Sequence, residues 1–479
     1  MPPKRKLTFT IQMIRTLLFI LCWLSALQAM PQHPSDNLRK AITLADAVFA
    51  HSLDTLNGEQ RLSFYYDLQL QRPSTRIVSV WEYTTALEAV GSIMEALDGM
   101  RQLEPQLYET HFPRYAARFH SLFMGMDYYK GTFRLNSYTR HQAEWSPYGV
   151  NRAHAKGQAQ VDGVLNVYDD QMWIVRELLR AYRLTGEQAY LERAEELTAY
   201  VLDGWDCTLD TQGQEHGGIT WGPGYTSKHA CSNGPMVSPL VWLSQIYKGK
   251  RSRTIQYTLL PDGTIRTQRV RKSSYYLDMA ARIYRYHKQH YLMPDKGVCH
   301  DMEGGGGEVA YHSADGKTYR SHAPLGHPGG KPYTYNTGTL ISGAADLYAA
   351  TGQEAFLHDL QQIVPLSYAF FATQRGTLWQ LPYKAGPTDA SPSGSPWFND
   401  VLLRGYMAAS PHVQATHTYL MRAQQTLDYA YAHHLASPGF LPADLVGGWH
   451  AGEPPHADTM AQLSFASDYA MLALYRAQL

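Results

Sequence analysis

The stretch Leu184–Leu191, which reads LTGEQAYL, decides the fold of this chain because it joins two segments with helical patterns. Before it, apolar residues from Met172 to Tyr182 recur at helical spacing, and a second helical pattern begins at Gln188. Nearly the same phrase, ATGQEAFL, returns at Ala350–Leu357 between two further helical segments. Two helical hairpins with one turn design indicate a repeated structural unit.

Apolar residues at helical spacing predict further helices on both sides of the two repeats. In the last of these segments, Asp468 is nearly the only charged residue before Arg476, so this helix should be buried on all sides. The further helical segments are residues 38–53, 81–97, 115–129, 233–247, 273–290, 398–409, 415–435 and 458–477.

The last predicted helix has no partner after it, and the first has none before it. These two helices can pair if the array closes into a ring, whereas an open helical solenoid would leave an unpaired helix at each end. We therefore expect an all-α fold, an (α/α)6 toroid or barrel of alternating inner and outer helices. It would form a single domain of residues 30–479.

Two segments interrupt the helical pattern. Residues Thr254–Val270 alternate in the manner of strands around Pro261-Asp262-Gly263, which predicts a small β-hairpin insertion. Residues 297–331 are expected to be a long loop, of the kind that is usually functional or mobile. Histidines in this loop match no metal-ligand spacing and are interpreted as solvated, so we expect neither a metal nor a cofactor. They are His300, His312, His322 and His327.

The N-terminus has the features of a signal peptide at residues 1–29. Lys4 and Arg5 supply positive charge, the apolar run Leu17–Leu27 is too short to span a bilayer, and Ala29 offers a small residue for cleavage. We therefore expect an exported protein, periplasmic or extracellular, with no membrane span in the mature chain. The 42 basic and 42 acidic residues balance, so the sequence has no electrostatic footprint for nucleic acid or an anionic membrane.

Three cysteines remain after cleavage of the signal peptide, namely Cys207, Cys231 and Cys299. An odd number excludes a complete disulfide framework. Cys207 and Cys231 are compatible with one bridge in an oxidising compartment, and equally with burial as single thiols.

Two adjacent carboxylates, Asp169 and Asp170, directly precede the first helical run. They lie at or near a helix N-terminus, where unpaired backbone N–H groups and the positive end of the helix dipole favour negative charge. One interpretation is an N-cap, for which a single Asp suffices. The other is catalysis, because two neighbouring carboxylates resist ionising together, so that one holds its proton near neutral pH as a general acid must.

In an alternating ring, the N-termini of all inner helices open on one face, and the residues there are aromatic, amide and carboxylate side chains. Such a wall is typical of a carbohydrate cleft, with rings that stack on sugars and amides that bind hydroxyl groups. Trp221 is interpreted as a sugar platform or as buried packing, and Asp301 as a substrate contact or a turn residue. The residues that we expect to bind substrate are Trp81, Tyr168, Trp221, Asn233, Asp301, Tyr335 and Asn336.

Six motifs are distributed over most of the chain: Tyr168-Asp169-Asp170-Gln171, Leu184-Thr185-Gly186, Gly204-Trp205-Asp206, Gly217-Gly218-Ile219-Thr220-Trp221, Ser232-Asn233-Gly234 and Tyr333-Thr334-Tyr335-Asn336-Thr337-Gly338. In this order they resemble glycoside hydrolase family 76, the endo-α-1,6-mannanases and related transglycosylases. The resemblance implies an (α/α)6 barrel and a retaining mechanism, with Asp169 as nucleophile and Asp170 as general acid/base. Thr337 stands where the family usually has Gln, and Thr220 where a further Gly or aromatic residue is common.

The expected function is that of a retaining, endo-acting glycoside hydrolase that cleaves α-1,6-mannosidic linkages in mannan with the Asp169–Asp170 pair. Its partner would be a polysaccharide or oligosaccharide substrate. Two alternatives are open, a mannan transglycosylase with the same pair and a catalytically silent glycan-binding protein. An unsaturated glucuronyl hydrolase should carry basic residues for a uronate, and the predicted rim is poor in Arg and Lys.

Overall fold

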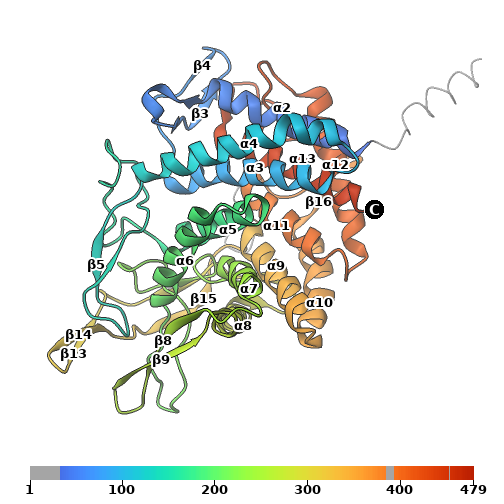
Figure 1. Ribbon diagram of the computed structural model, residues 1–479. Helices are drawn as coiled ribbons and strands as arrows, with labels where there is room; N and C mark the ends of the chain where they lie inside the picture. The colour runs from blue at the N-terminus through green and yellow to red at the C-terminus, as the bar shows by residue number, and fades with distance from the viewer. Residues whose placement is uncertain (1–32, 384–392, 453) are drawn as a thin grey trace, which may run out of the picture.

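Six inner helices contact one another in sequence order (Figure 1). The computed structural model describes residues 33–383, 393–452 and 454–479. Each inner helix contacts the next, and the last contacts the first, so that the contacts run around a ring. The inner helices are α3 (Val80–Gly99), α5 (Tyr168–Thr185), α7 (Val237–Ile246), α9 (Thr334–Thr351), α11 (Pro396–Ala409) and α13 (Thr459–Ala477).

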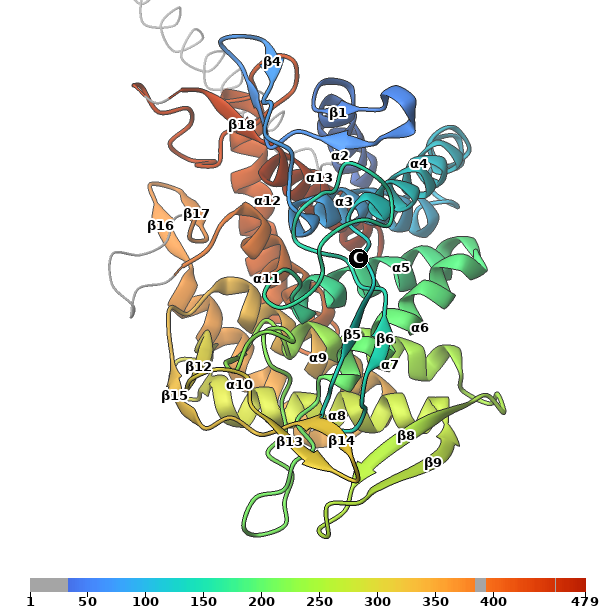
Figure 2. The ribbon, with the colours of Figure 1, turned by 90° about the vertical axis from the view of Figure 1, so that its left-hand side faces the viewer.

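Six further helices pack against the outside of this ring (Figures 1 and 2). The expected pairing of the first and last helices is confirmed, because α2 packs against α13. Residues 461–473 of α13 are all buried, as the near absence of charge predicted. The outer helices are α2 (Pro34–His51), α4 (Pro105–Gly125), α6 (Gln188–Asp203), α8 (Lys272–Tyr291), α10 (Glu354–Phe371) and α12 (Ala415–His433).

The two repeated turns end their inner helices in the same way. Gly186 follows α5 with a φ of 72°, and Gly352 follows α9 with a φ of 66°. In this left-handed conformation a glycine has no Cβ to clash with the backbone. The N–H groups of these glycines donate to the carbonyl oxygens of Tyr182 and Tyr348, both at 2.8 Å. The repeated phrase in the sequence is therefore a repeated helix C-cap.

Two glycines allow the inner helices α9 and α11 to approach closely. A Cβ on Gly338 would come within 2.4 Å of the Val401 carbonyl oxygen, and one on Gly405 within 2.7 Å of the Gly338 carbonyl oxygen. Beside them, Thr337 Oγ1 accepts a hydrogen bond from the Cys299 N–H at 3.1 Å. The Thr337-Gly338 pair therefore fixes α9 against its neighbours.

The predicted hairpin is confirmed, but the predicted long loop is wrong. In the hairpin, β8 (Arg253–Leu259) pairs with β9 (Ile265–Arg271), and Thr254 lies opposite Val270. Residues 297–331 instead form short strands, because β12 pairs with β7 far away in the sequence and β13 pairs with β14. The strands of this region are β7 (Lys228–His229), β11 (Val298–Cys299), β12 (Met302–Gly305), β13 (Tyr311–Ala314), β14 (Lys317–Arg320) and β15 (Leu325–Gly329).

The all-α prediction is therefore correct for the ring and incomplete for its connections. Strands β5, β6, β13 and β14 lie in front of the helices in Figure 2. Strands of two to five residues carry too little alternation to be recognised in a sequence. The remaining strands are β1 (Leu53–Asp54), β2 (Arg61–Leu62), β3 (Tyr65–Asp67), β4 (Arg72–Pro73), β5 (Phe133–Leu135), β6 (Ala143–Trp145), β10 (Leu292–Met293), β16 (Thr373–Arg375), β17 (Leu378–Gln380) and β18 (His456–Asp458), and the 3₁₀ turns are Leu56–Gly58, Met126–Tyr128 and Gly234–Met236.

Cys207, Cys231 and Cys299 are buried free thiols, so the alternative of single burial is the correct one and no Cys207–Cys231 bridge is present. The predicted signal peptide lies outside the described residues. Among the helices that the structure describes, none has both the length and the apolar character needed to cross a membrane. The same residues contain no group of three or more His, Cys, Asp or Glu side chains placed to bind a metal ion.

Candidate active site

A cleft of about 560 Å³ opens where the N-termini of the inner helices meet. Four inner helices, α3, α5, α9 and α11, contribute residues from or near their first turns, as the alternating arrangement predicts. The segment before α7, the loop before α5 and the turn between β11 and β12 complete the wall. The lining residues are Ser79, Trp81, Val150, Asn151, Val164, Leu165, Val167, Asp169, Asp170, Trp173, Trp221, Tyr225, His229, Cys231, Asp301, Tyr333, Tyr335, Trp397 and Phe398.

Asp169 and Asp170 occupy the first turn of α5 and both line the cleft. The N-cap residue is Val167, so neither carboxylate is the cap of this helix. The start of the helix is held by its backbone, because the Tyr168 N–H donates to the Trp221 carbonyl oxygen at 2.8 Å. Asp169 Oδ1 is buried and has no hydrogen-bond partner among the described residues. The capping interpretation therefore does not account for the pair.

The two carboxyl groups hold their protons with different strength. Burial raises the pKa of Asp169 to about 6, and the neighbouring Cys231 and Trp221 side chains act against that rise. Asp170 is only 7% exposed, and its pKa is raised well above the ordinary range by burial first and then by the charges of Asp169 and Glu82. A charge on Asp169 therefore favours the protonated form of Asp170. A nucleophile and a general acid need this difference.

Trp221 and His229 form the wall beside Asp169. Their rings stack with centroids 4.7 Å apart and planes 19° apart. His229 follows Lys228 on β7, and the buried Lys228 Nζ donates to Asp206 Oδ2 at 2.9 Å. This buried ion pair anchors β7 and so holds the two stacked rings in place.

Asp301 brings a third carboxyl group to the cleft. It lies between β11 and β12, and Asn336 Nδ2 on α9 donates a hydrogen bond to Asp301 Oδ1 at 3.1 Å. Burial raises the pKa of Asp301 to about 6, the hydrogen bond from Asn336 lowers it, and the charge of Asp169 raises it further. Its place in the lining is compatible with substrate contact, the first of the two interpretations.

An aromatic cluster forms another part of the wall. Trp397 meets Trp173 edge-on at 5.0 Å and Trp81 edge-on at 5.3 Å between ring centroids. Tyr335 lies against Phe398 at 4.3 Å. These rings pack together separately from the main hydrophobic core. Ring faces of this kind suit the C–H faces of sugars.

The structure brings most of the residues expected at the site to one place. The two proposed catalytic residues line the cleft together with Trp81, Trp221, Asp301 and Tyr335. Tyr168, Asn233 and Asn336 do not line it, and all three are buried.

These three residues support the wall from behind. The Tyr168 ring packs against Tyr200 at 5.0 Å. Asn233 bonds to the backbone of Ile219 and His229, and Asn336 donates to Asp301. The expectation that they contact substrate directly therefore needs correction, because a side chain at a helix start can turn into the core as readily as out of it.

Several lining residues were not among those expected to bind substrate. Trp397, Phe398 and Tyr333 stand at inner-helix starts, so the same argument that selected Trp81 could have selected them. His229 lies on β7 and reaches the cleft through the pairing of β7 with β12, while Tyr225 and Cys231 lie on either side of this strand, so none of the three carries a signal in the sequence. Trp173 belongs to the apolar stripe of α5 and could not be distinguished from a core residue.

A family model described as Glycosyl hydrolase family 76 matches residues 111–252 and 254–437. A comparison with curated proteins finds no match.

Solved structures similar to this chain include three from the same family. A family 76 glycoside hydrolase from a bovine Bacteroides thetaiotaomicron strain has a TM-score of 0.65 at 20% identity, over 92% of this chain and 78% of that one. An inactive variant of the α-1,6-mannanase GH76A of Salegentibacter sp. HEL1_6, in complex with α-1,6-mannotriose, has a TM-score of 0.59 at 19% identity, over 92% of this chain and 100% of that one. A family 76 mannosidase from Bacteroides thetaiotaomicron VPI-5482 has a TM-score of 0.64 at 18% identity, over 92% of this chain and 99% of that one. At this level of identity the likeness concerns the fold.

Proposed function

We infer the function of this chain from its family and its cleft: it belongs to glycosyl hydrolase family 76, and we propose that it is a retaining, endo-acting hydrolase of α-1,6-mannosidic linkages in mannan. Membership of the family makes it a glycoside hydrolase that acts on mannan. The proposed retaining mechanism is argued from the Asp169–Asp170 pair, two carboxyl groups in the same cleft of which a charged Asp169 favours the protonated form of Asp170.

In the first step, Asp170 donates its proton to the glycosidic oxygen while the Asp169 carboxylate attacks the anomeric carbon. The bond to the leaving chain breaks, and the mannosyl group is held on Asp169 as an ester. Asp170, now a carboxylate, then takes a proton from a water molecule. This water attacks the same carbon and releases Asp169, so that two inversions retain the configuration.

The cleft suits a neutral sugar chain. No Lys or Arg stands among its lining residues in the described part of the chain, so it offers no cation to a uronate. This speaks against an unsaturated glucuronyl hydrolase. The partly exposed rings of Trp81 and Tyr335 offer stacking faces for sugars. Support for α-1,6-mannan comes from the similar mannanase GH76A, whose structure contains α-1,6-mannotriose.

We also propose that the ring of helices is an (α/α)6 barrel and that residues 30–479 form one catalytic domain. The cycle of contacts from α3 to α13 and back to α3 supports the barrel. Residues 1–29 are proposed to direct export to the periplasm or the medium, on the order of charged, apolar and small residues there.

Hydrolysis of unbranched α-1,6-mannan tests the proposed function. We expect the unaltered protein to release reducing ends and to produce oligosaccharides of intermediate length early in the reaction. Asp169→Asn should release none, whereas Asp162→Asn should act like the unaltered protein, because Asp162 is exposed and outside the cleft lining.

Two other outcomes would favour the alternatives. No release of reducing ends by the unaltered protein, with mannan still bound, would favour a catalytically silent glycan-binding protein. Transfer of mannosyl groups to an added oligosaccharide acceptor, with little hydrolysis, would favour a transglycosylase.

A further inference from the structure

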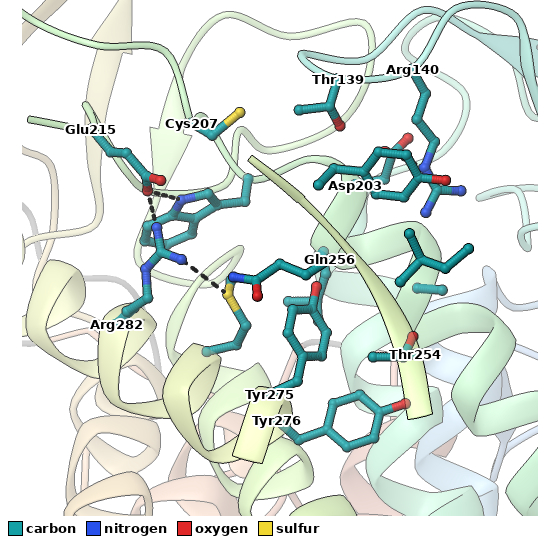
Figure 3. Close-up of a pocket in the computed structure, with 16 residues that line it drawn as sticks. Thr139, Arg140, Asp203, Cys207, Glu215, Thr254, Gln256, Tyr275, Tyr276 and Arg282 are labelled. Atoms are coloured by element: carbon teal, nitrogen blue, oxygen red, sulfur yellow. Dashed lines mark hydrogen bonds and ion pairs between the residues drawn. The ribbon is translucent and has the colours of Figure 1, made fainter. Parts of the chain in front are cut away.

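A second pocket lies on the outside of the helix ring, next to the inserted hairpin (Figure 3). Strand β8 of the hairpin, the C-terminal end of α6 and one face of α8 enclose it. Its lining shares no residue with the cleft. We call it the hairpin pocket, and its charged and polar walls include Arg140, Asp203, Glu215, Gln256, Tyr275 and Arg282.

Every charged side chain that lines the hairpin pocket is paired with an opposite charge. Arg140 Nε lies 3.3 Å from Asp203 Oδ1, and Arg282 forms an ion pair with Glu215 on another side of the pocket (Figure 3). Burial raises the pKa of Asp203 to about 6, so this carboxylate is ionised at pH 7 and its pair with Arg140 holds. The pocket therefore offers no unpaired charge to an ionic ligand and suits a neutral one.

Between the two ion pairs stand polar groups that make no side-chain hydrogen bond to another described residue. The Gln256 amide projects from β8, and the Tyr275 side chain projects from α8 on the facing side (Figure 3). The ring of Tyr257 lies beside them, with the Arg140 guanidinium 4.4 Å from its centroid. Sugars match this combination, because their hydroxyl groups donate and accept hydrogen bonds while their C–H faces pack on rings.

Asp203 lies on the wall of the pocket and is held by neighbouring residues. Its Oδ1 accepts a hydrogen bond from Ser137 Oγ at 2.9 Å and faces Arg140. Its Oδ2 is buried, and the neighbouring Trp145 side chain acts with Arg140 and Ser137 to lower the pKa of this carboxyl group. Asp203 therefore holds Arg140 and Ser137 in place on this wall of the pocket.

We propose that the hairpin pocket is a second carbohydrate-binding site, which takes one neutral hexosyl residue outside the cleft. Gln256 and Tyr275 bind its hydroxyl groups, and Tyr257 packs against its apolar face. A polysaccharide bound there is tethered to the protein, which raises the effective concentration of the rest of the chain at the cleft. The identification of this sugar as a mannosyl residue rests on the proposed function.

Affinity electrophoresis in gels that contain α-1,6-mannan tests this proposal. The parent protein is Asp169→Asn, so that the mannan is not consumed, and the test variant adds Gln256→Ala and Tyr257→Ala on β8. The matched control adds Thr267→Ala and Gln268→Ala, which change the facing residues on β9 outside the pocket. We expect the apparent dissociation constant for mannan to rise by about tenfold or more in the test variant, as when one of two linked sites is lost. The control should migrate like the parent.

The same β8 and β9 substitutions are also made with Asp169 intact, and hydrolysis of a short aryl α-1,6-mannobioside is measured. We expect unchanged kcat/KM, because this substrate fills the cleft alone. Equal retardation of the test variant and the parent would overturn the proposal. So would a fall in mannobioside hydrolysis, in the variant with the β8 substitutions, as large as its loss of mannan binding. Tyr275→Phe removes only a hydroxyl group on α8 and leaves the hairpin unchanged. It should also weaken retardation, which would show that the loss of binding does not come from a misfolded hairpin. Hydrolysis of mannan by the unaltered protein is measured alongside, so that failure of the proposed activity is seen separately.

Discussion

Trp397 Nε1 donates a hydrogen bond to Glu88 Oε2 at 2.8 Å, and this contact joins the cleft wall to an ion network inside the helix ring. Glu88 also pairs with Arg404 and, at 3.8 Å, with Arg176. Burial acts to raise the pKa of Glu88, but the charges of Arg404 and Arg176 outweigh it and hold that pKa at about 2. Glu88 is therefore ionised at any working pH, and a charge-assisted hydrogen bond orients the Trp397 ring.

Removal of the Glu88 charge should strongly destabilise the protein. Glu88→Gln leaves the buried Arg404 and Arg176 without their carboxylate, so we expect the free energy of unfolding at pH 7 to fall by about 3–5 kcal/mol. Because the pKa of Glu88 is depressed, its contribution holds above the ordinary carboxyl range and is lost as the pH falls towards 2. Urea unfolding followed by tryptophan fluorescence measures the change.

Glu144→Gln is the matched control, since Glu144 pairs with Arg134 in an exposed ion pair. Such pairs contribute at most about 1 kcal/mol, so this variant should unfold nearly as the unaltered protein does. Equal losses in both variants would contradict the role assigned to the buried network.

Gly338→Ala should destabilise the contact between α9 and α11. The new Cβ would meet the backbone oxygen of Val401, which cannot move without its helix, so we expect a loss of about 1–3 kcal/mol despite the higher helix propensity of alanine. Gly343→Ala on the same helix is the control, because the three atoms nearest to its Cβ belong to the side chains of Val237 and Tyr284 and not to a helix backbone. Thermal unfolding that ranks Gly343→Ala as the more damaging change would argue against the close helix approach.

The raised pKa of Asp169 should appear in the pH dependence of kcat/KM. Below about pH 6 Asp169 holds a proton and cannot attack, so kcat/KM should fall about tenfold per pH unit on the acidic side. The pKa of Asp170 is raised by burial and by the charge of Asp169, so the loss of activity that follows its deprotonation should lie at higher pH than the Asp169 limb. A rate that decreases as the pH rises from 5 to 7 would exclude this division of protons.

A Trp221 variant checks whether Asp169 causes the acidic limb of the pH profile, which is the fall in kcat/KM at low pH. Its side chain helps to lower the pKa of Asp169, so Trp221→Phe should move the limb to higher pH. Trp81→Phe alters another ring of the cleft that has no such effect on Asp169, and it should leave the position of the limb unchanged.

The helix ring could be predicted because its information is local. Each outer helix has an apolar face at helical spacing, and the turns after α5 and α9 need glycine in the left-handed conformation. The strands could not be predicted, because two-residue segments such as β7 form only by pairing with distant β12. For the same reason, residues 297–331 were expected to be a loop, whereas they form several short paired strands.

The two carboxylates of the candidate site could be predicted from the sequence. Which of the other residues line the cleft was harder to predict. Asp169 and Asp170 stand out because two adjacent carboxylates lie at the start of a helix, where an N-cap needs only one. Asn233 and Asn336 have the same residue type as a sugar contact, but only tertiary structure reveals that their amides bond to the protein itself. His229 reaches the cleft through β7, and nothing in its own neighbourhood of the sequence marks it.

The central claim, that Asp169 is the nucleophile and Asp170 the general acid/base, leads to a prediction about configuration. An activated aryl α-1,6-mannobioside needs little protonation of its leaving group, so Asp170→Asn should still form the β-linked mannosyl ester on Asp169. Azide can attack this ester without a base. The product is then an α-mannosyl azide, with the configuration of the substrate.

Nuclear magnetic resonance of the anomeric proton of this azide product is the most direct measurement. Asp170→Asn with azide should give the α-mannosyl azide, whereas Asp169→Asn, which lacks the nucleophile, should give only β-mannosyl azide or none. A β-mannosyl azide from Asp170→Asn would contradict the account, because azide would then have replaced a missing nucleophile and the roles of the two residues would be reversed.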